Sequence, residues 1–194
     1  MPVTAIEIVA LRAGYPVSTI AGLKANCDSY GTGFFNLQKN RYEILIDENS
    51  YENWQISAQF TIAEELGHLL AHWDYIKDFH TLAQRIAFET ELDQNTFQIF
   101  EKQAKNVGSA LLLPSQHFDP YIFNWAAQAD LAKQYFPDAA DLALHISQEL
   151  SPKLDVSQQV VERALKRAAP TKLVDEIVTK LNLKLGRATL PPAK

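Results

Sequence analysis

One stretch, residues 60–72 with the sequence FTIAEELGHLLAH, constrains the fold of this chain more than any other. Its apolar residues recur at spacings of three and four: Phe60, Ile62, Ala63, Leu66, Leu69 and Leu70. This periodicity predicts a helix with a largely buried face. Ionisable side chains are costly in a core unless they are paired or bind a metal. The ionisable side chains within this stretch are therefore candidates for a functional site: Glu64, Glu65, His68 and His72.

The spacing of these four residues is close to that of a metal-binding helix. Glu64, His68 and His72 fall at i, i+4 and i+8, on one face of the helix. Glu65 is turned from Glu64 by about 100°, since a helix has about 3.6 residues per turn. In the zinc-protease pattern H-E-x-x-H, two His hold the metal and the Glu is the general base. Here the first ligand position is Glu64 instead of His.

Length and composition favour a small globular protein. A chain of 194 residues with 47% hydrophobic content suits one domain, or one domain with a helical extension. No apolar run approaches a membrane span, and we expect no signal peptide. A single cysteine, Cys27, excludes an internal disulfide and fits a reducing compartment. We therefore expect a cytoplasmic protein without a membrane partner.

The charge is unevenly distributed along the chain. Residues 151–194 contain nine Lys or Arg and four Asp or Glu, a net charge of +5. Residues 1–150 contain 9 basic and 19 acidic residues, a net charge of −10. A basic segment on an acidic body indicates either an anionic partner such as nucleic acid or a solvated helical surface. We place the domain boundary here, with 1–150 as the main domain and 151–194 as a basic helical extension.

The remaining pattern predicts one small sheet among many helices. Residues 30–37 and 41–47 form a β-hairpin with a turn at Lys39 and Asn40. Residues 47–50 form a loop, and Ser50 could cap the helix that follows. We expect residues 73–80 and 115–125 to be irregular, and prolines 137, 152 and 170 to separate the later helices. Helices are expected at residues 4–13, 18–25, 81–113, 126–134, 139–150, 157–168 and 171–183. The class is α+β, with a small antiparallel sheet packed on the helix of residues 60–72 and a mainly helical C-terminal half.

Two spaced motifs resemble the ImmA/IrrE-like family of metallopeptidases. FTIAEELGHLLAH is followed, about thirty residues later, by QAKNVGSALLLP. Family members carry F-T-x-A-H-E-x-G-H-x-x-x-H and then E-A-N-x-F-A-x-x-L-L-x-P, whose opening Glu is the third zinc ligand. Aligned on residues 111–114, Gln103 falls on that Glu and Lys105 on the Asn. The segment LSPKLDVSQQVVERALKR is similar to the helix-turn-helix-like segment that follows the peptidase core, so the resemblance covers about residues 5–168.

The resemblance implies a zincin-like site with changed ligands. Glu65 matches the catalytic base, and Glu64, His68 and Gln103 match the three metal ligands. Replacing an imidazole by a carboxylate and a carboxylate by an amide gives an oxygen-rich set that drifts from zinc toward Mg, Ca or Mn. We therefore expect weak or absent zinc, or another divalent metal. His72 could complete the set, and Glu101 could do so if α-helical geometry is distorted, because it is turned by about 200° from Gln103.

Three functions are compatible with these motifs and with the resemblance to the family. The favoured one is an impaired or inactive peptidase that keeps the fold as a protein-binding regulator. The alternative is an active metal-dependent endopeptidase that cleaves a specific regulatory protein such as a repressor. A further alternative is a DNA-associated regulator that binds through residues 151–194. The first two predict a protein partner or substrate, and the third predicts a nucleic-acid partner.

Overall fold

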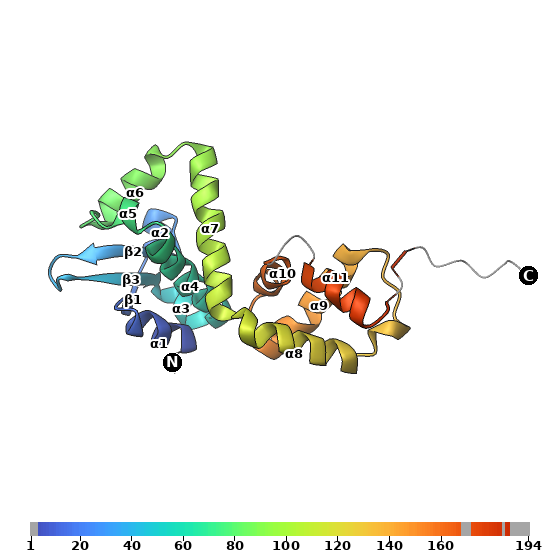
Figure 1. Ribbon diagram of the computed structural model, residues 1–194. Coiled ribbons are helices and arrows are strands. Elements are labelled where there is room, and N and C mark those ends of the chain that lie inside the picture. Colours follow the sequence, from blue (N-terminus) through green and yellow to red (C-terminus); the bar gives the residue numbers. More distant parts are fainter. Residues whose placement is uncertain (1–3, 168–171, 184, 187–194) are drawn as a thin grey trace, which may run out of the picture. The chain divides into compact units, whose positions relative to one another are not determined.

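The computed structural model describes residues 4–167, 172–183 and 185–186. The chain divides into two compact units, Met1–Leu112 and Leu113–Lys194 (Figure 1). The domain boundary predicted at 150/151 falls inside a continuous helix, α9 (Ala139–Leu154). A separate role for residues 151–194 stays a prediction.

The first unit contains a sheet of three strands in the order β1-β3-β2. Strands β2 (Gly31–Asn36) and β3 (Arg41–Asp47) pair antiparallel, which confirms the predicted hairpin. Its turn includes Asn40 with a φ of +49°, a conformation that Asn tolerates better than most residues. The α+β class is confirmed. The sheet is mixed, however, because β1 (Val17–Ile20) pairs parallel with β3.

Strand β1 replaces most of a helix that the sequence predicts. The prediction of a helix at residues 18–25 is wrong. Val17 to Ile20 pair with Ile44 to Asp47 of β3, and in this region the helix α2 covers only Leu23–Cys27. Val, Thr and Ile fit a pleated sheet surface well. Local periodicity does not show this pairing, because β3 is far along the chain.

The helix predicted around residues 60–72 is confirmed as α4 (Gln55–Ala71). It does not begin from the loop expected at residues 47–50. Instead, α3 (Glu48–Asn53) precedes it, and the Asp47 carboxylate caps α3 by accepting the Ser50 N–H at 3.1 Å. After α4, the segment expected to be irregular contains α5 (Trp73–Ile76). At the start of the chain, α1 (Ala5–Arg12) confirms the first predicted helix.

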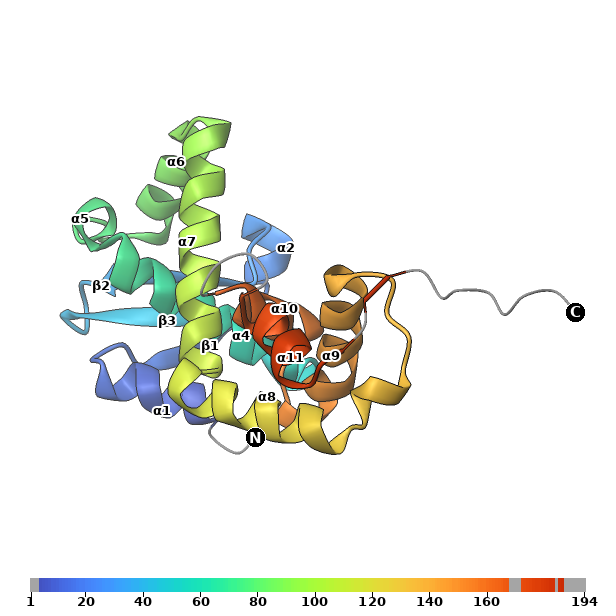
Figure 2. The same cartoon turned by 45° about the vertical axis from the view of Figure 1, so that its right-hand side comes forward.

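The long helical region expected at residues 81–113 is two helices, α6 (Leu82–Glu91) and α7 (Gln94–Leu112). The break lies at Asp93, whose carboxylate accepts the Thr96 N–H at 3.0 Å and so caps the start of α7. Both views show α7 standing beside α4 (Figures 1 and 2). The break therefore allows α7 to turn back onto the predicted metal-binding helix.

The core of the first unit lies where α4 meets the sheet. Its buried apolar members come from α1, β3, α4 and α5: Ile6, Ala10, Ile44, Ile46, Ile62, Ala63, Leu66, Leu69 and Ile76. Strand β2 approaches α4 closely, since a Cβ added at Gly33 would lie 3.3 Å from Leu69. Burial of these side chains is the main stabilising contribution to the unit.

A second close contact joins α4 to α7. A Cβ added at Gly67 would lie 2.4 Å from the backbone oxygen of Ala104, and one added at Gly108 would lie 2.9 Å from the backbone of Ala63. The two backbones therefore approach each other closely at these glycines. This contact fixes which side chains of α4 and α7 face each other.

The second unit is helical, with α8 (Ser115–Gln128), η1 (Leu131–Lys133), α9, α10 (Gln158–Lys166) and α11 (Lys172–Lys180). The prediction of an irregular segment at residues 115–125 is wrong, because α8 continues through Pro120. Its buried residues Phe118, Ile122 and Ala126 recur every fourth position, so packing outweighs the missing proline N–H. Pro152 likewise lies inside α9 instead of ending it. Within the described residues, every helix is too short or too polar to cross a bilayer.

The glycine contact predicts a stability change of unusual sign. An alanine normally stabilises a helix interior relative to glycine by about 1 kcal/mol. We expect Gly67→Ala to destabilise the protein by about 1–3 kcal/mol, because the new methyl group would overlap the Ala104 backbone. Urea denaturation measures the change, with exposed Asn106→Ala on α7 as the control. A Gly67→Ala variant as stable as the parent protein would contradict this account of the packing.

Candidate functional site

Helix α4 presents its ionisable face to α7, as the sequence predicts. Glu64 lies against Lys105, with Oε1 and Nζ 3.3 Å apart. One turn on, His68 Nε2 lies 3.3 Å from Glu101 Oε1. A further turn on, His72 Nε2 lies 2.9 Å from Gln103 Oε1. The face predicted from residue spacing is therefore a row of polar contacts between two helices.

Within the described residues, one group of His and acidic side chains could hold a metal ion. It consists of Glu64, His68 and Glu101, whose potential ligand atoms lie within 4.8 Å of one another. Glu101 reaches His68 from an undistorted α7, because the register between α4 and α7 places it there. Gln103, the residue that the sequence assigned to the third ligand position, lies against His72. The metal-binding roles of all five residues, His72 included, stay predictions.

Lys105 lies between the two carboxylates of this group. Its Nζ is 2.5 Å from Glu101 Oε2 and 3.3 Å from Glu64 Oε1. The two acids share this single ammonium. Burial raises the pKa of Glu64 to about 7, with Lys105 opposing the rise. Burial also acts on Glu101, but the hydrogen bonds from His68 and Lys105 outweigh it and hold the pKa of Glu101 at about 2. We call Glu64, His68, Glu101 and Lys105 the site cluster.

The two histidines form a chain of ring contacts. His68 Nδ1 lies 3.1 Å from His72 Nδ1, and the His72 ring stacks on Phe100 with centroids 4.2 Å apart. With the Gln103 oxygen facing His72 Nε2, His72 donates from Nε2 and accepts at Nδ1. In its neutral form His68 then carries its proton on Nδ1 and turns the Nε2 lone pair toward Glu101, to which Nε2 donates a hydrogen bond only when the ring is charged. Burial lowers the pKa of His68, which favours the neutral form, and the hydrogen bond to Glu101, which requires the charged ring, opposes this effect.

Glu65, the predicted general base, contacts the sheet. Its Oε2 accepts the backbone N–H of Gly33 on β2 at 2.9 Å. The absence of a side chain on Gly31 leaves room for this approach, since a Cβ added there would lie 3.3 Å from Glu65. Glu65 is only 8% exposed. Burial raises its pKa to about 8, a rise that the charge of Arg85 opposes and those of nearby acids increase.

Arg85 and Glu89 of α6 belong to this environment, and sequence reasoning missed both. Arg85 is buried, and its Nε lies 2.7 Å from Glu89 Oε1. Their i, i+4 spacing is an ordinary helix-surface pattern, so the sequence carries no signal that they approach Glu65. Burial raises the pKa of Glu89 as well, with Arg85 opposing the rise.

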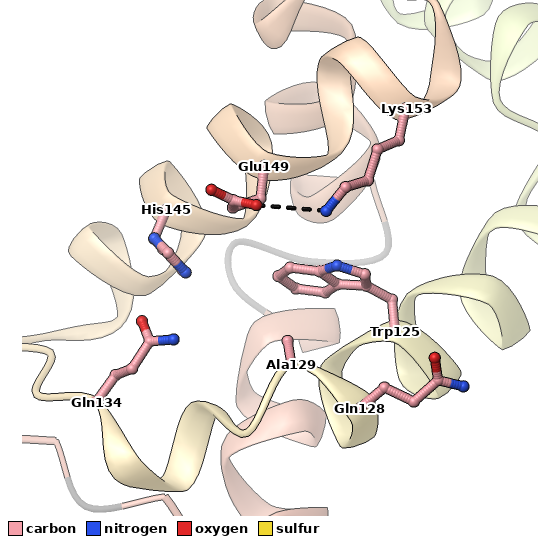
Figure 3. A pocket seen from close by; sticks show the side chains of 7 residues that line it. All are labelled: Trp125, Gln128, Ala129, Gln134, His145, Glu149 and Lys153. Atoms are coloured by element: carbon pink, nitrogen blue, oxygen red, sulfur yellow. Dashed lines mark hydrogen bonds and ion pairs between the residues drawn. The ribbon is translucent and has the colours of Figure 1, made fainter.

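Each of the two units has an open pocket outside the site cluster. In the first unit, a pocket of about 260 Å³ is lined by α2, β2, α6 and the start of α7: Cys27, Asp28, Ser29, Thr32, Leu82, Ile86, Glu89, Thr90 and Phe97. In the second unit, a pocket of about 430 Å³ lies between Trp125 and the α9 residues His145, Glu149 and Lys153 (Figure 3). Glu149 and Lys153 pair there at 3.3 Å. Neither pocket is lined by a residue of the site cluster.

The fold and the site define a class of protein. A helix that carries an E-E-x-x-H motif lies against a small sheet, and a second helix supplies a carboxylate, which is the plan of a metallopeptidase-like domain. The chain matches the family model of the IrrE N-terminal-like domain, Peptidase_M78, over residues 24–166. The protein therefore belongs to this family, which confirms the resemblance to ImmA/IrrE-like metallopeptidases. Neither the curated proteins nor the solved structures contain a significant match.

The raised pKa of Glu65 predicts a pH-dependent stability. Between the usual pKa near 4.5 and the folded value of about 8, the folded chain keeps a proton that the unfolded chain loses. Stability from this group is therefore present below about pH 4.5 and declines as the pH rises to 8. Relative to the parent protein, Glu65→Gln should gain stability over this window, on the order of a few kcal/mol. Chemical denaturation at pH 5, 6.5 and 8 measures it.

An exposed acid provides the matched control for this experiment. Glu91→Gln, at the exposed end of α6, should leave the slope of stability against pH unchanged. If Glu65→Gln and the parent protein keep a constant difference in stability from pH 5 to 8, Glu65 is not protonated in the folded state.

Proposed function

We propose that this protein is a metallopeptidase-like regulator whose hydrolytic site is impaired and whose fold binds a protein partner. The state of Glu65 is the observation that carries this proposal. A general base must be ionised and must reach the water that it deprotonates. Glu65 is buried against β2, accepts the Gly33 N–H and has a pKa of about 8. Its carboxyl group is therefore mostly protonated at neutral pH.

The ligand set gives further support. Zinc is the metal typical of this family, and it is commonly held by imidazole nitrogens together with a carboxylate. In the site cluster, His68 is the single imidazole beside the carboxylate oxygens of Glu64 and Glu101. The Lys105 ammonium contacts both carboxylates. This arrangement fits a resident zinc ion poorly. An oxygen-rich set is better suited to a weakly held Mg, Ca or Mn ion.

Exposed aromatic side chains near the site support a protein partner. Tyr75 and Trp73 of α5 are 58% and 39% exposed. The Tyr75 ring contacts Phe100, whose own ring stacks on His72. Aromatic residues are enriched in protein interfaces, and their exposure costs free energy in an unbound protein. We therefore place the partner-binding surface on the first unit, beside the site cluster.

An active metal-dependent endopeptidase is the alternative, and one observation favours it. When His68 is neutral, the contacts from Gln103 through His72 leave its Nε2 lone pair directed at Glu101, as in a metal-binding imidazole whose other nitrogen is held by the protein. With a dication beside it, the pKa of Glu65 would fall, and the base could then ionise.

The DNA-binding alternative has less support from the described residues. Of three cations suited to phosphate contacts, Lys166 is exposed, whereas Arg163 and Arg167 are half-buried and already interact within the chain. Burial lowers the pKa of Arg167. Phosphate binding requires cations at the surface, so the nucleic-acid partner stays a prediction.

Metal content and hydrolysis test the proposed function together. The purified protein should contain much less than one zinc per chain by elemental analysis, and it should leave casein and a mixed peptide library uncut, with or without added zinc. The Glu65→Gln variant should behave identically, because the parent site already lacks an ionised base. Near-stoichiometric zinc together with cleavage that disappears in Glu65→Gln would establish an active peptidase instead.

A further inference from the structure

The ammonium group of Lys105 lies where two carboxylates converge. Its Nζ contacts Glu101 Oε2 at 2.5 Å and Glu64 Oε1 at 3.3 Å. The two Glu side chains are largely buried, with 24% and 16% exposure for Glu101 and Glu64. Both belong to the group of potential ligands that could surround a metal ion. A positive charge of the chain itself therefore neutralises this group.

We propose that Lys105 is a built-in cation that stands in place of a divalent metal ion between Glu64 and Glu101. We further infer that removing its charge converts Glu64, His68 and Glu101 into a site for a divalent cation. This inference rests on the proposed function, in which the parent protein lacks tightly bound zinc. The inference adds a physical reason why the parent protein would lack tightly bound zinc.

Electrostatics explains why a metal ion and Lys105 exclude each other. Two carboxylates in a partly buried position repel each other unless a cation lies between them. Lys105 supplies that cation from within the same helix, one turn after Glu101, so no binding from solution is needed. A metal ion would have to displace the ammonium from both carboxylates, and it would be repelled by that ammonium if it stayed nearby. The tethered charge therefore lowers the affinity for a free dication.

The geometry that remains without Lys105 is close to a coordination shell. Ligand atoms about 2.1 Å from one tetrahedral ion lie about 3.4 Å apart. His68 Nε2 and Glu101 Oε1 already lie 3.3 Å apart. All three potential ligand atoms lie within 4.8 Å of one another, so a small closure of the Glu64 side chain completes the group. His72 holds the His68 ring from the other side through the 3.1 Å contact between their Nδ1 atoms.

Lys105→Met tests the inference, because methionine keeps a long side chain and removes the charge. Lys102→Met, on the exposed side of the same helix, is the matched control. Zn²⁺ and Mn²⁺ are titrated into each full-length protein by calorimetry, and the thermal unfolding midpoint is measured with and without metal. We expect Lys105→Met to bind Zn²⁺ at one site, at least about tenfold more tightly than the parent protein and Lys102→Met. Its unfolding midpoint should rise with metal, whereas the other two should change little.

A second substitution identifies the ligands. Adding Glu101→Gln to Lys105→Met should abolish the gain in affinity, since an amide is a weaker ligand than a carboxylate. If Lys105→Met does not fold without metal, Lys105→Gln provides a polar neutral side chain for the same titration.

The outcomes separate this inference from the proposed function. If the parent protein binds Zn²⁺ as tightly as Lys105→Met, or if neither neutral variant gains affinity, Lys105 does not stand in for a metal ion. Either result can occur in a protein that cleaves nothing, and the impaired-peptidase proposal then survives. Zinc-dependent cleavage by the parent protein would instead overturn the proposed function.

Discussion

The backbone contact between α4 and α7 decides which chemical groups meet in this protein. Gly67 lies against Ala104, and Gly108 lies against Ala63, so two helices that carry the polar residues touch without side chains between them. Because the contact leaves no room for sliding, it sets the register of the facing side chains. A shift by one turn would separate Lys105 from the two carboxylates and give each histidine a different neighbour. The chemistry of the site thus depends on a packing constraint that contains no ionisable residue.

Charge balance follows from that register. Four carboxyl groups, including Glu89, act on one another around α4 and α7, and the neighbouring cations are Lys105 and Arg85. Burial favours the protonated form of an acid, and a nearby cation opposes this effect to a degree that depends on its contacts. Glu101, beside Lys105 and His68, is the ionised member, and among the described residues the hydrogen-bond partner of the buried Glu65 is the backbone N–H of Gly33. The small number of neighbouring cations therefore supports two proposals: that Glu65 is neutral, and that Lys105 takes the place of a metal ion.

Prediction from sequence succeeded where the signal is local. The hairpin turn at Asn40 and the periodicity of α4 both follow from neighbouring residues, and both are confirmed. It failed where distant pairing decides the conformation. Strand β1 exists because β3 offers a parallel edge, and α8 continues through Pro120 because its buried face is packed. Neither reason is visible within a short window of sequence.

The sequence by itself determined the family, the fold class and the helix face that carries Glu64, His68 and His72, since motif spacing and helical periodicity are properties of the chain alone. Only the tertiary structure decided what this face meets. Motif alignment places Gln103 at the third ligand position, whereas the packing of α7 brings Glu101 to His68 and Lys105 between the acids. The physical reason is that alignment fixes position along a helix, while the partner across an interface depends on the close approach of two backbones.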